Sequence, residues 1–199
     1  MIGEIEDAIV KRIQDAAAAA PGFGYKLATV ASYGGHLDDP DLAQVIRAFP
    51  AVWVTYAGGP KPVKANASGS KWKTGATFAV MCGSRNIRGE RATRQGVTAA
   101  GVIKEVGVYQ MLEDVSRILK HQDLGLPIYR LVPGATRTLY NTRLGSNGMA
   151  VFAREFHTMY IEADPVDTTG ADFLKLGMNF FSQLNHSVTP DDLSEITLL

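Results

Sequence analysis

Four arginines occupy every third position in the stretch SRNIRGERATRQGVTAAG, residues 84–101. They are Arg85, Arg88, Arg91 and Arg94. Guanidinium groups bind carboxylates through paired hydrogen bonds and are attracted to phosphates, so this run could grip an acidic protein surface or lie along DNA. Because Gly89, Gly96 and Gly101 interrupt it and glycine is costly inside a helix, we predict a loop. Three interpretations stay open: a solvated loop, a grip on a neighbouring subunit, or the lining of a DNA channel.

Histidine and cysteine offer little further chemistry. The histidines at 36, 121, 157 and 186 fall in different predicted elements and include no H-x-x-x-H pair, so we predict no metal site. Cys82 is the only cysteine, and a catalytic cysteine can use a histidine distant in sequence. However, Cys82 follows the apolar run TFAVM, and a buried free cysteine behaves as a small hydrophobe.

The remaining motifs do not match known metal-binding or nucleotide-binding patterns. Asp38, Asp39 and Asp41 lie beside His36 but lack the glycine and final glutamate of a calcium loop, so we assign them to helix capping. The glycines of YGGH, YAGGPKP and ASGSKWK fit neither G-x-G-x-x-G nor a P-loop. We therefore predict no cofactor, no catalytic residue and no enzymatic activity, and keep a hydrolase using Cys82 as a minor alternative.

Composition limits the classes of partner. The chain has 199 residues, with 20 Lys+Arg against 20 Asp+Glu, so any positive field must be local. The first residues, MIGEIEDAIVKRI, are acidic at the start and are interrupted by a Lys-Arg pair, unlike a signal peptide. No apolar run approaches the roughly 18 to 20 residues that span a bilayer. We expect a soluble, unexported protein from a reducing compartment, with no membrane partner.

Periodicity predicts the elements that position these residues. Isoleucines at three- and four-residue steps predict a helix over 2–20, and Asp39 and Pro40 begin a short helix that closes before Pro50. Apolar spacing predicts a second long helix over 102–122. Strands are predicted over 25–33, 51–58 and 72–84, with an exposed loop over 59–71, and consecutive strands are predicted over 123–163, including 136–144 and 149–163. We predict an α+β fold with a mixed, mainly antiparallel sheet packed on two long amphipathic helices.

The last predicted strand suggests a surface that binds a partner. Its alternate residues form two faces, Phe152, Arg154, Phe156, Thr158 and Tyr160 against Val151, Ala153, Glu155, His157, Met159 and Ile161. Neither face is purely apolar, as expected for a sheet with helices on one side and a partner on the other. Residues 1–162 then form the main domain. Residues 163–199 show no sustained period and form an extension, with Phe180 and Phe181 among its docking anchors.

Several blocks in a fixed order carry a family resemblance. They are MIGEIEDAIVKRI, YGGHLDD, FPAVWVTYAG, WKTGATFAVMCGSRN, EVGVYQMLEDVSRIL, QDLGLPIYRLVPG and TLYNTRL followed by AREFHTMY. Together they resemble a Mu-like phage family of tail proteins encoded just before the contractile-tail sheath. Proteins of that kind are thought to be tail terminators. The resemblance covers about residues 1–162 and contains no catalytic motif.

The resemblance implies a virion structural protein with a tail-terminator-like fold. Such a protein would form a ring of six copies at the head-proximal end of the tail, assembled in the host cytoplasm. It would cap the tail tube and sheath and join the tail to the head connector. A head-tail connector or neck protein of the same particle is the alternative. As interface or lumen residues we select the arginines named above with Lys61, Lys64, Phe180 and Phe181, within the 58–71 loop, the 85–98 loop and the extension.

Overall fold

The computed structural model describes residues 1–35, 49–67, 69–86, 89–100, 102–144, 147–163, 175–179 and 193–197. Contacts divide the chain into two units, Met1–Asp164 and Pro165–Leu199. The short helix predicted before Pro50 falls on residues 36–48, outside the described ranges.

One sheet forms the centre of the first unit. Its described strands are β1 (Thr29–Ser32), β2 (Ala51–Tyr56), β3 (Val63–Lys64), β4 (Lys71–Asn86), β7 (Val132–Leu144) and β8 (Asn147–Ala163). The order is β1-β2-β4-β8-β7, with β3 paired to the start of β4. Only β1 and β2 run parallel among these pairs. The prediction of an α+β fold with a mixed, mainly antiparallel sheet is confirmed.

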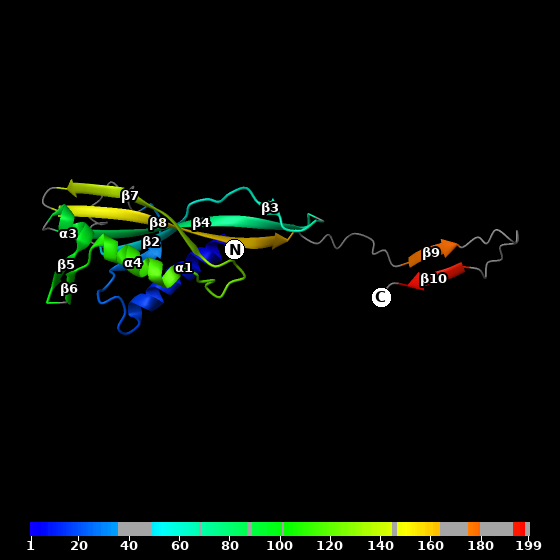
Figure 1. Ribbon diagram of the computed structural model, residues 1–199, viewed down its shortest axis with the longest axis horizontal. Helices are drawn as coiled ribbons and strands as arrows, with labels where there is room; N and C mark the ends of the chain where they lie inside the picture. Colours follow the sequence, from blue (N-terminus) through cyan, green and yellow to red (C-terminus); the bar gives the residue numbers. More distant parts are fainter. Residues whose placement is uncertain are drawn as a thin grey trace. The chain divides into compact units, whose positions relative to one another are not determined.

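Helices α1 (Ile2–Ala18) and α4 (Val108–Leu119) cover the same face of this sheet (Figure 1). Ile5, Ile9 and Ile13 recur at four-residue steps, so they form one apolar stripe, and all three are fully buried. They share a core with sheet residues such as Phe78 and Phe156. Burying such a stripe against a sheet is what holds an amphipathic helix in place, because each large apolar side chain contributes about 1.5–3 kcal/mol.

The predicted second long helix is only partly correct. Residues 102–105 form strand β6 (Val102–Glu105), which pairs with β5 (Val97–Ala99), and α4 starts only after its N-cap, Gly107. Val102 and Val106 have helical spacing, but the β-branched pair Val102–Ile103 fits a strand equally well. The turn at Ala100, with φ of 51°, allows the two short strands to pair. The first strand is also shorter than predicted, since β1 covers Thr29–Ser32 of the expected 25–33.

The two faces of the sheet differ in how they are covered. Alternate residues of β4 and β8, including Phe78, Val80 and Phe156, lie in the core beneath the helices. On the opposite face a second, smaller cluster buries Trp53 and Met81 with Phe49 packed beside them. This second cluster lies toward the end of β4 that carries Gly83 and Asn86, and the other half of that face carries exposed Met159 and Ile161.

The second unit contains strands β9 (Lys175–Asn179) and β10 (Leu193–Thr197), which pair antiparallel. The sequence pattern predicted no element there. These strands are the described part of the predicted extension.

Candidate assembly surfaces

The arginine stretch contains a helix, contrary to the predicted loop. Helix α3 spans Glu90–Gln95, and its N-cap and C-cap are Gly89 and Gly96. Both glycines have positive φ, 117° and 77°, so they are at the helix ends, where glycine is tolerated, and not in its interior. The cost of glycine inside a helix, on which the loop prediction depended, therefore does not apply to these two residues. Gly96 also allows a close backbone approach, because an added Cβ would lie 2.7 Å from the nitrogen of Gly107.

The structure brings three of the four arginines to one end of the sheet. Arg85 is exposed near the end of β4, and Arg91 and Arg94 lie on α3, which contacts β4 and β8. Arg91 is exposed and donates a hydrogen bond to Oε1 of Gln95 at 3.0 Å. Arg88 lies outside the described residues.

Arg85 also lies on the wall of a hollow of about 430 Å³. Lys26, Lys104 and Glu105 share this wall, so cationic groups outnumber the single carboxylate among these four. The side chain of Asn86 donates a hydrogen bond to Glu105, which occupies part of that carboxylate. The arginine end of the sheet is therefore a locally positive surface on a neutral chain.

The two candidate lysines lie at the other end of β4. Lys61 is exposed, and exposed Lys64 belongs to β3, where it pairs with Trp72. Trp72 precedes Arg85 by thirteen residues of the same strand, which corresponds to about 43 Å at 3.3 Å per residue. The selected cations thus form two separate groups. Phe180 and Phe181 lie outside the described residues.

An apolar groove lies on the open half of the sheet. It encloses about 530 Å³ and is lined by Pro60, Thr77, Tyr129, Val132, His157 and Met159; we call it the open-face groove. One wall is formed where Pro60 crosses Gly75, whose missing Cβ would lie 2.7 Å from the proline ring. The other wall is held by a hydrogen bond from the nitrogen of Tyr129 to the carbonyl of Met159, at 2.7 Å.

A line of polar side chains begins at Thr77 and His157, which line the open-face groove, and continues beyond it toward β7. His157 Nδ1 lies 2.9 Å from Oγ1 of Thr77, and His157 Nε2 lies 3.9 Å from Oε2 of Glu155. Glu155 in turn pairs with Nε of Arg137 at 3.2 Å. The imidazole lies against the backbone of β7, because a Cβ added at Gly134 would be 2.2 Å from its Nε2. This line links β4, β8 and β7 by polar contacts on an otherwise apolar surface.

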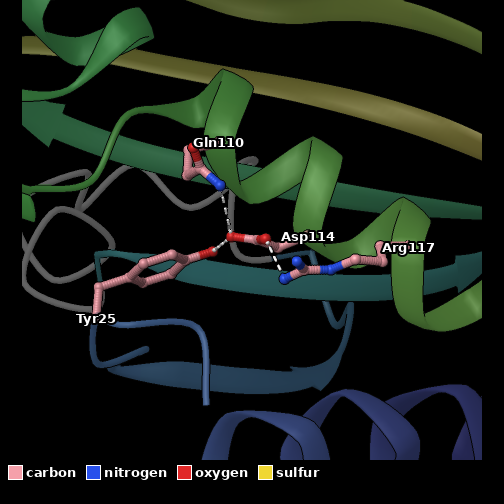
Figure 2. Close-up of polar contacts among 4 residues, drawn as sticks. All are labelled: Tyr25, Gln110, Asp114 and Arg117. Atoms are coloured by element: carbon pink, nitrogen blue, oxygen red, sulfur yellow. Dashed lines mark hydrogen bonds and ion pairs between the residues drawn. The ribbon is translucent and has the colours of Figure 1, made fainter. Parts of the chain in front are cut away.

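A buried carboxylate joins α4 to the segment before β1. Figure 2 shows Asp114 accepting hydrogen bonds from the hydroxyl of Tyr25 at 3.1 Å, from Gln110 at 3.0 Å and from Arg117 at 2.7 Å. Asp114 is only 4% exposed, so these donors replace the water that its charge needs. Burial, followed by the nearby Asp114 charge, raises the pKa of Tyr25 well above its usual value. The phenol therefore remains a proton donor to the carboxylate, which suits a structural contact.

Cys82 lies in the core at 0% exposure, and burial raises the pKa of its thiol to about 12. A neutral thiol that solvent cannot reach is a poor nucleophile, so Cys82 is poorly suited to the hydrolase mechanism considered above. In the parts of the chain that the structure describes, no three His, Cys, Asp or Glu side chains gather as metal ligands. Within those same ranges, no helix combines the length and apolarity needed to cross a bilayer.

Sequence reasoning missed both the open-face groove and the Asp114 cluster. A signal for the cluster was present, because Asp114 falls between Met111 and Val115 on the apolar side of a predicted helix. For the groove the only signal was the mixed polarity of the last predicted strand, because the hollow itself depends on which residues of β4 and β8 are paired and on the path of residues 57–60.

A family model described as "Bacteriophage Mu, Gp37" matches residues 1–161. No curated protein matches the chain. The matched residues include both core helices, the central sheet up to the last two residues of β8, and the whole open-face groove.

Proposed function

Because the chain belongs to the Bacteriophage Mu, Gp37 family, we propose that it is a tail terminator, a structural protein of the virion. The family membership confirms the resemblance to a Mu phage family. The finer role is our inference. In this proposal the protein has a tail-terminator-like fold, and six copies form a ring at the head-proximal end of a contractile tail. The ring stops growth of the tube and sheath and meets the head connector.

The observation that carries this proposal is the uneven covering of the sheet. Helices α1 and α4 pack on one face of the sheet and form the main core with it. Half of the other face carries exposed apolar residues, namely Tyr129, Val132, Met159 and Ile161. Contiguous exposed apolar residues of this kind mark surfaces that bind another protein. A ring subunit needs such surfaces, since each copy contacts two neighbours through unlike faces.

The separation of the cationic groups also supports a ring subunit. A heterologous interface presents different surfaces to its two neighbours, and Lys64 and Arg85 are separated by about 43 Å of β4. One group can therefore contact a neighbour while the other contacts the tube or the channel. Repetition of Arg85, Arg91 and Arg94 around a ring multiplies a modest local charge. We propose no catalytic role for any residue.

The experiment is a tube-growth assay with purified components. Tail tube protein polymerises alone or with this chain, and tube lengths are measured by negative-stain electron microscopy, with native mass spectrometry of the chain alone. We expect rings of six and shorter tubes that carry a ring at one end. A chain that stays monomeric, both alone and with tube protein, would overturn the proposal. Rings that bind the portal side of the particle and leave the tube free would identify a head-tail connector instead.

A variant of the arginine stretch separates its roles within that proposal. Arg85, Arg88, Arg91 and Arg94 are replaced together by Ser. Loss of rings supports a grip on carboxylates of the neighbour, because bidentate guanidinium pairs are lost. Normal rings with poor DNA retention in the particle support a channel lining. Normal rings and normal DNA retention assign the arginines to solvent.

A further inference from the structure

The open-face groove has no described occupant. Its exposed apolar residues, Tyr129, Val132 and Met159, surround about 530 Å³, and no described residue fills that volume. Ile161 continues the apolar surface along β8 beyond Met159. A protein that exposes such a surface in isolation covers it in its assembly.

The rim of the open-face groove is positively charged. Lys73 shares one face of β4 with Thr77, because side chains alternate along a strand. The ammonium of Lys73 lies 4.6 Å from the ring centre of Tyr129, and Arg130 lines the groove beside it. The carboxylate of Glu155 on this face is already paired with Arg137. The surface therefore favours an apolar segment that also carries negative charge.

The chain itself contains a segment of that composition. Residues 164–199 hold six acidic residues and one lysine, a formal charge of −5. The acidic residues are Asp164, Asp167, Asp172, Asp191, Asp192 and Glu195. Because the whole chain is neutral, residues 1–163 carry +5. The same segment has three phenylalanines, Phe173, Phe180 and Phe181, on either side of β9.

We propose that the open-face groove of one copy binds the acidic extension, residues 164–199, of a second copy. The phenylalanines enter the groove, and the carboxylates meet Lys73 and Arg130 on its rim. This inference rests on the proposed function only in requiring that copies associate. It assigns one of the contacts between them.

The position where the extension begins allows it to reach a second copy. Strand β8 passes the groove at His157 and Met159 and ends at Ala163, so only four residues separate the groove lining from the extension. Twelve residues from Ala163 to Lys175 can span up to about 40 Å when extended. That reach is comparable to the diameter of a small domain. An extension given by each copy to the next closes a ring through a heterologous contact.

Cysteine cross-linking between copies tests the pairing directly. One full-length variant carries Met159→Cys in the groove, and a second carries Phe181→Cys in the extension. The native Cys82 is fully buried and stays unreactive. After mixing and treatment with a short bis-maleimide, we expect a covalent dimer of twice the 21.4 kDa chain, with a yield that falls as salt rises. The matched control replaces Met159→Cys by Val102→Cys, which is also exposed but lies on β6.

Three outcomes would overturn the pairing. The first is a dimer yield that is equal with the Val102→Cys control. The second is the absence of any dimer. The third is a double variant, Met159→Cys with Phe181→Cys in one chain, that cross-links only within itself at every dilution, because the extension would then occupy its own groove.

A charge-reversal series adds a readout that keeps the apolar contacts unchanged. The rim variant, Lys73→Glu with Arg130→Glu, should raise the concentration needed for half-assembly at least tenfold. Adding Asp172→Lys and Asp191→Lys in the extension should bring that concentration most of the way back to its original value. Lys120→Glu, at the exposed end of α4, is the matched control and should change the concentration needed for half-assembly less than twofold. Equal effects of the rim and control variants would refute the contact. If rings assemble and stop tubes with the rim variant, the groove contact fails and the terminator proposal stands. If copies cross-link but tubes grow unchecked, the groove contact stands and the terminator proposal fails.

Discussion

Removal of the buried carboxylate of Asp114 should destabilise the first unit by about 2–3 kcal/mol. In the Asp114→Ala variant, three donors lose their acceptor: the hydroxyl of Tyr25, the amide of Gln110 and the guanidinium of Arg117. The contact spans from residue 25 to residue 114, so it fixes the segment that enters β1 against α4.

The magnitude follows from the exposure of each donor. The side chain of Arg117 is 70% exposed, so water replaces its lost partner and the loss is that of a surface ion pair, at most about 1 kcal/mol. Tyr25 and Gln110 are partly buried, and each loses a bond to a charged acceptor, worth about 1.5–3 kcal/mol before compensation. Relief of the buried charge offsets part of that loss. A chain of this size should then melt about 5–10 °C lower.

The assay is urea and thermal unfolding followed by circular dichroism, below the concentration at which copies associate. Glu113→Ala, at the neighbouring exposed position of α4, is the control and should stay within about 0.5 kcal/mol of the natural chain. Tyr25→Phe alone should cost about 1 kcal/mol. The double variant of Tyr25 and Asp114 should cost less than the sum of the single ones, because the hydroxyl has no acceptor left to lose. An Asp114→Ala chain as stable as Glu113→Ala would refute the reasoning.

Two further predictions concern a close contact and the buried thiol. Gly134→Ala should cost about 1–3 kcal/mol, because its Cβ would meet Nε2 of His157 at 2.2 Å, and adding His157→Ala should recover most of the loss in urea unfolding; no recovery would place the strain elsewhere. Cys82 should react with a thiol reagent only as fast as the chain unfolds, and folding stability should fall as pH rises from 9 toward 12, since the folded state keeps the proton that the unfolded thiol loses. Cys82→Ala should flatten that fall by up to about 1.4 kcal/mol per pH unit, and an unchanged slope would contradict the assigned pKa.

The parts of the fold that sequence predicted well are those with a strong local period. The isoleucines of α1 repeat at four-residue steps, and the long alternation of β8 separates its faces as expected, with Phe156 and Tyr160 buried and His157 and Met159 outside. Both patterns arise from burial of one side of a regular element, so they can be read from residue types alone.

The parts that failed depend on what a residue does at the end of an element. Gly89 and Gly96 were counted as helix breakers, although as caps they allow α3 to form. Val102 satisfied a helical period by chance, and its pairing with Ala99 placed it in a strand. Neither distinction can be read from composition, because the same residue is favourable at a cap or turn and costly one position further inside.

The candidate surfaces were partly predictable. Lysines and arginines in polar stretches were expected to be exposed. The structure shows this for four of them, Lys61, Lys64, Arg85 and Arg91. Their division into two groups was not foreseen, because it follows from the length of β4. The open-face groove requires Thr77 of β4 to lie opposite His157 of β8, a register that no local pattern specifies.

The uninterrupted ladder between β4 and β8 limits how proteins of this family can change length. Every residue from Lys71 to Asn86 has a partner between Gly148 and Ala163, with no bulge to absorb an extra residue. One inserted residue in either strand would turn all residues beyond it to the opposite face, so Phe78 would point to the open side and Lys73 into the core on one side of the insertion. Length changes along this pair should therefore arise in steps of two residues, matched on both strands.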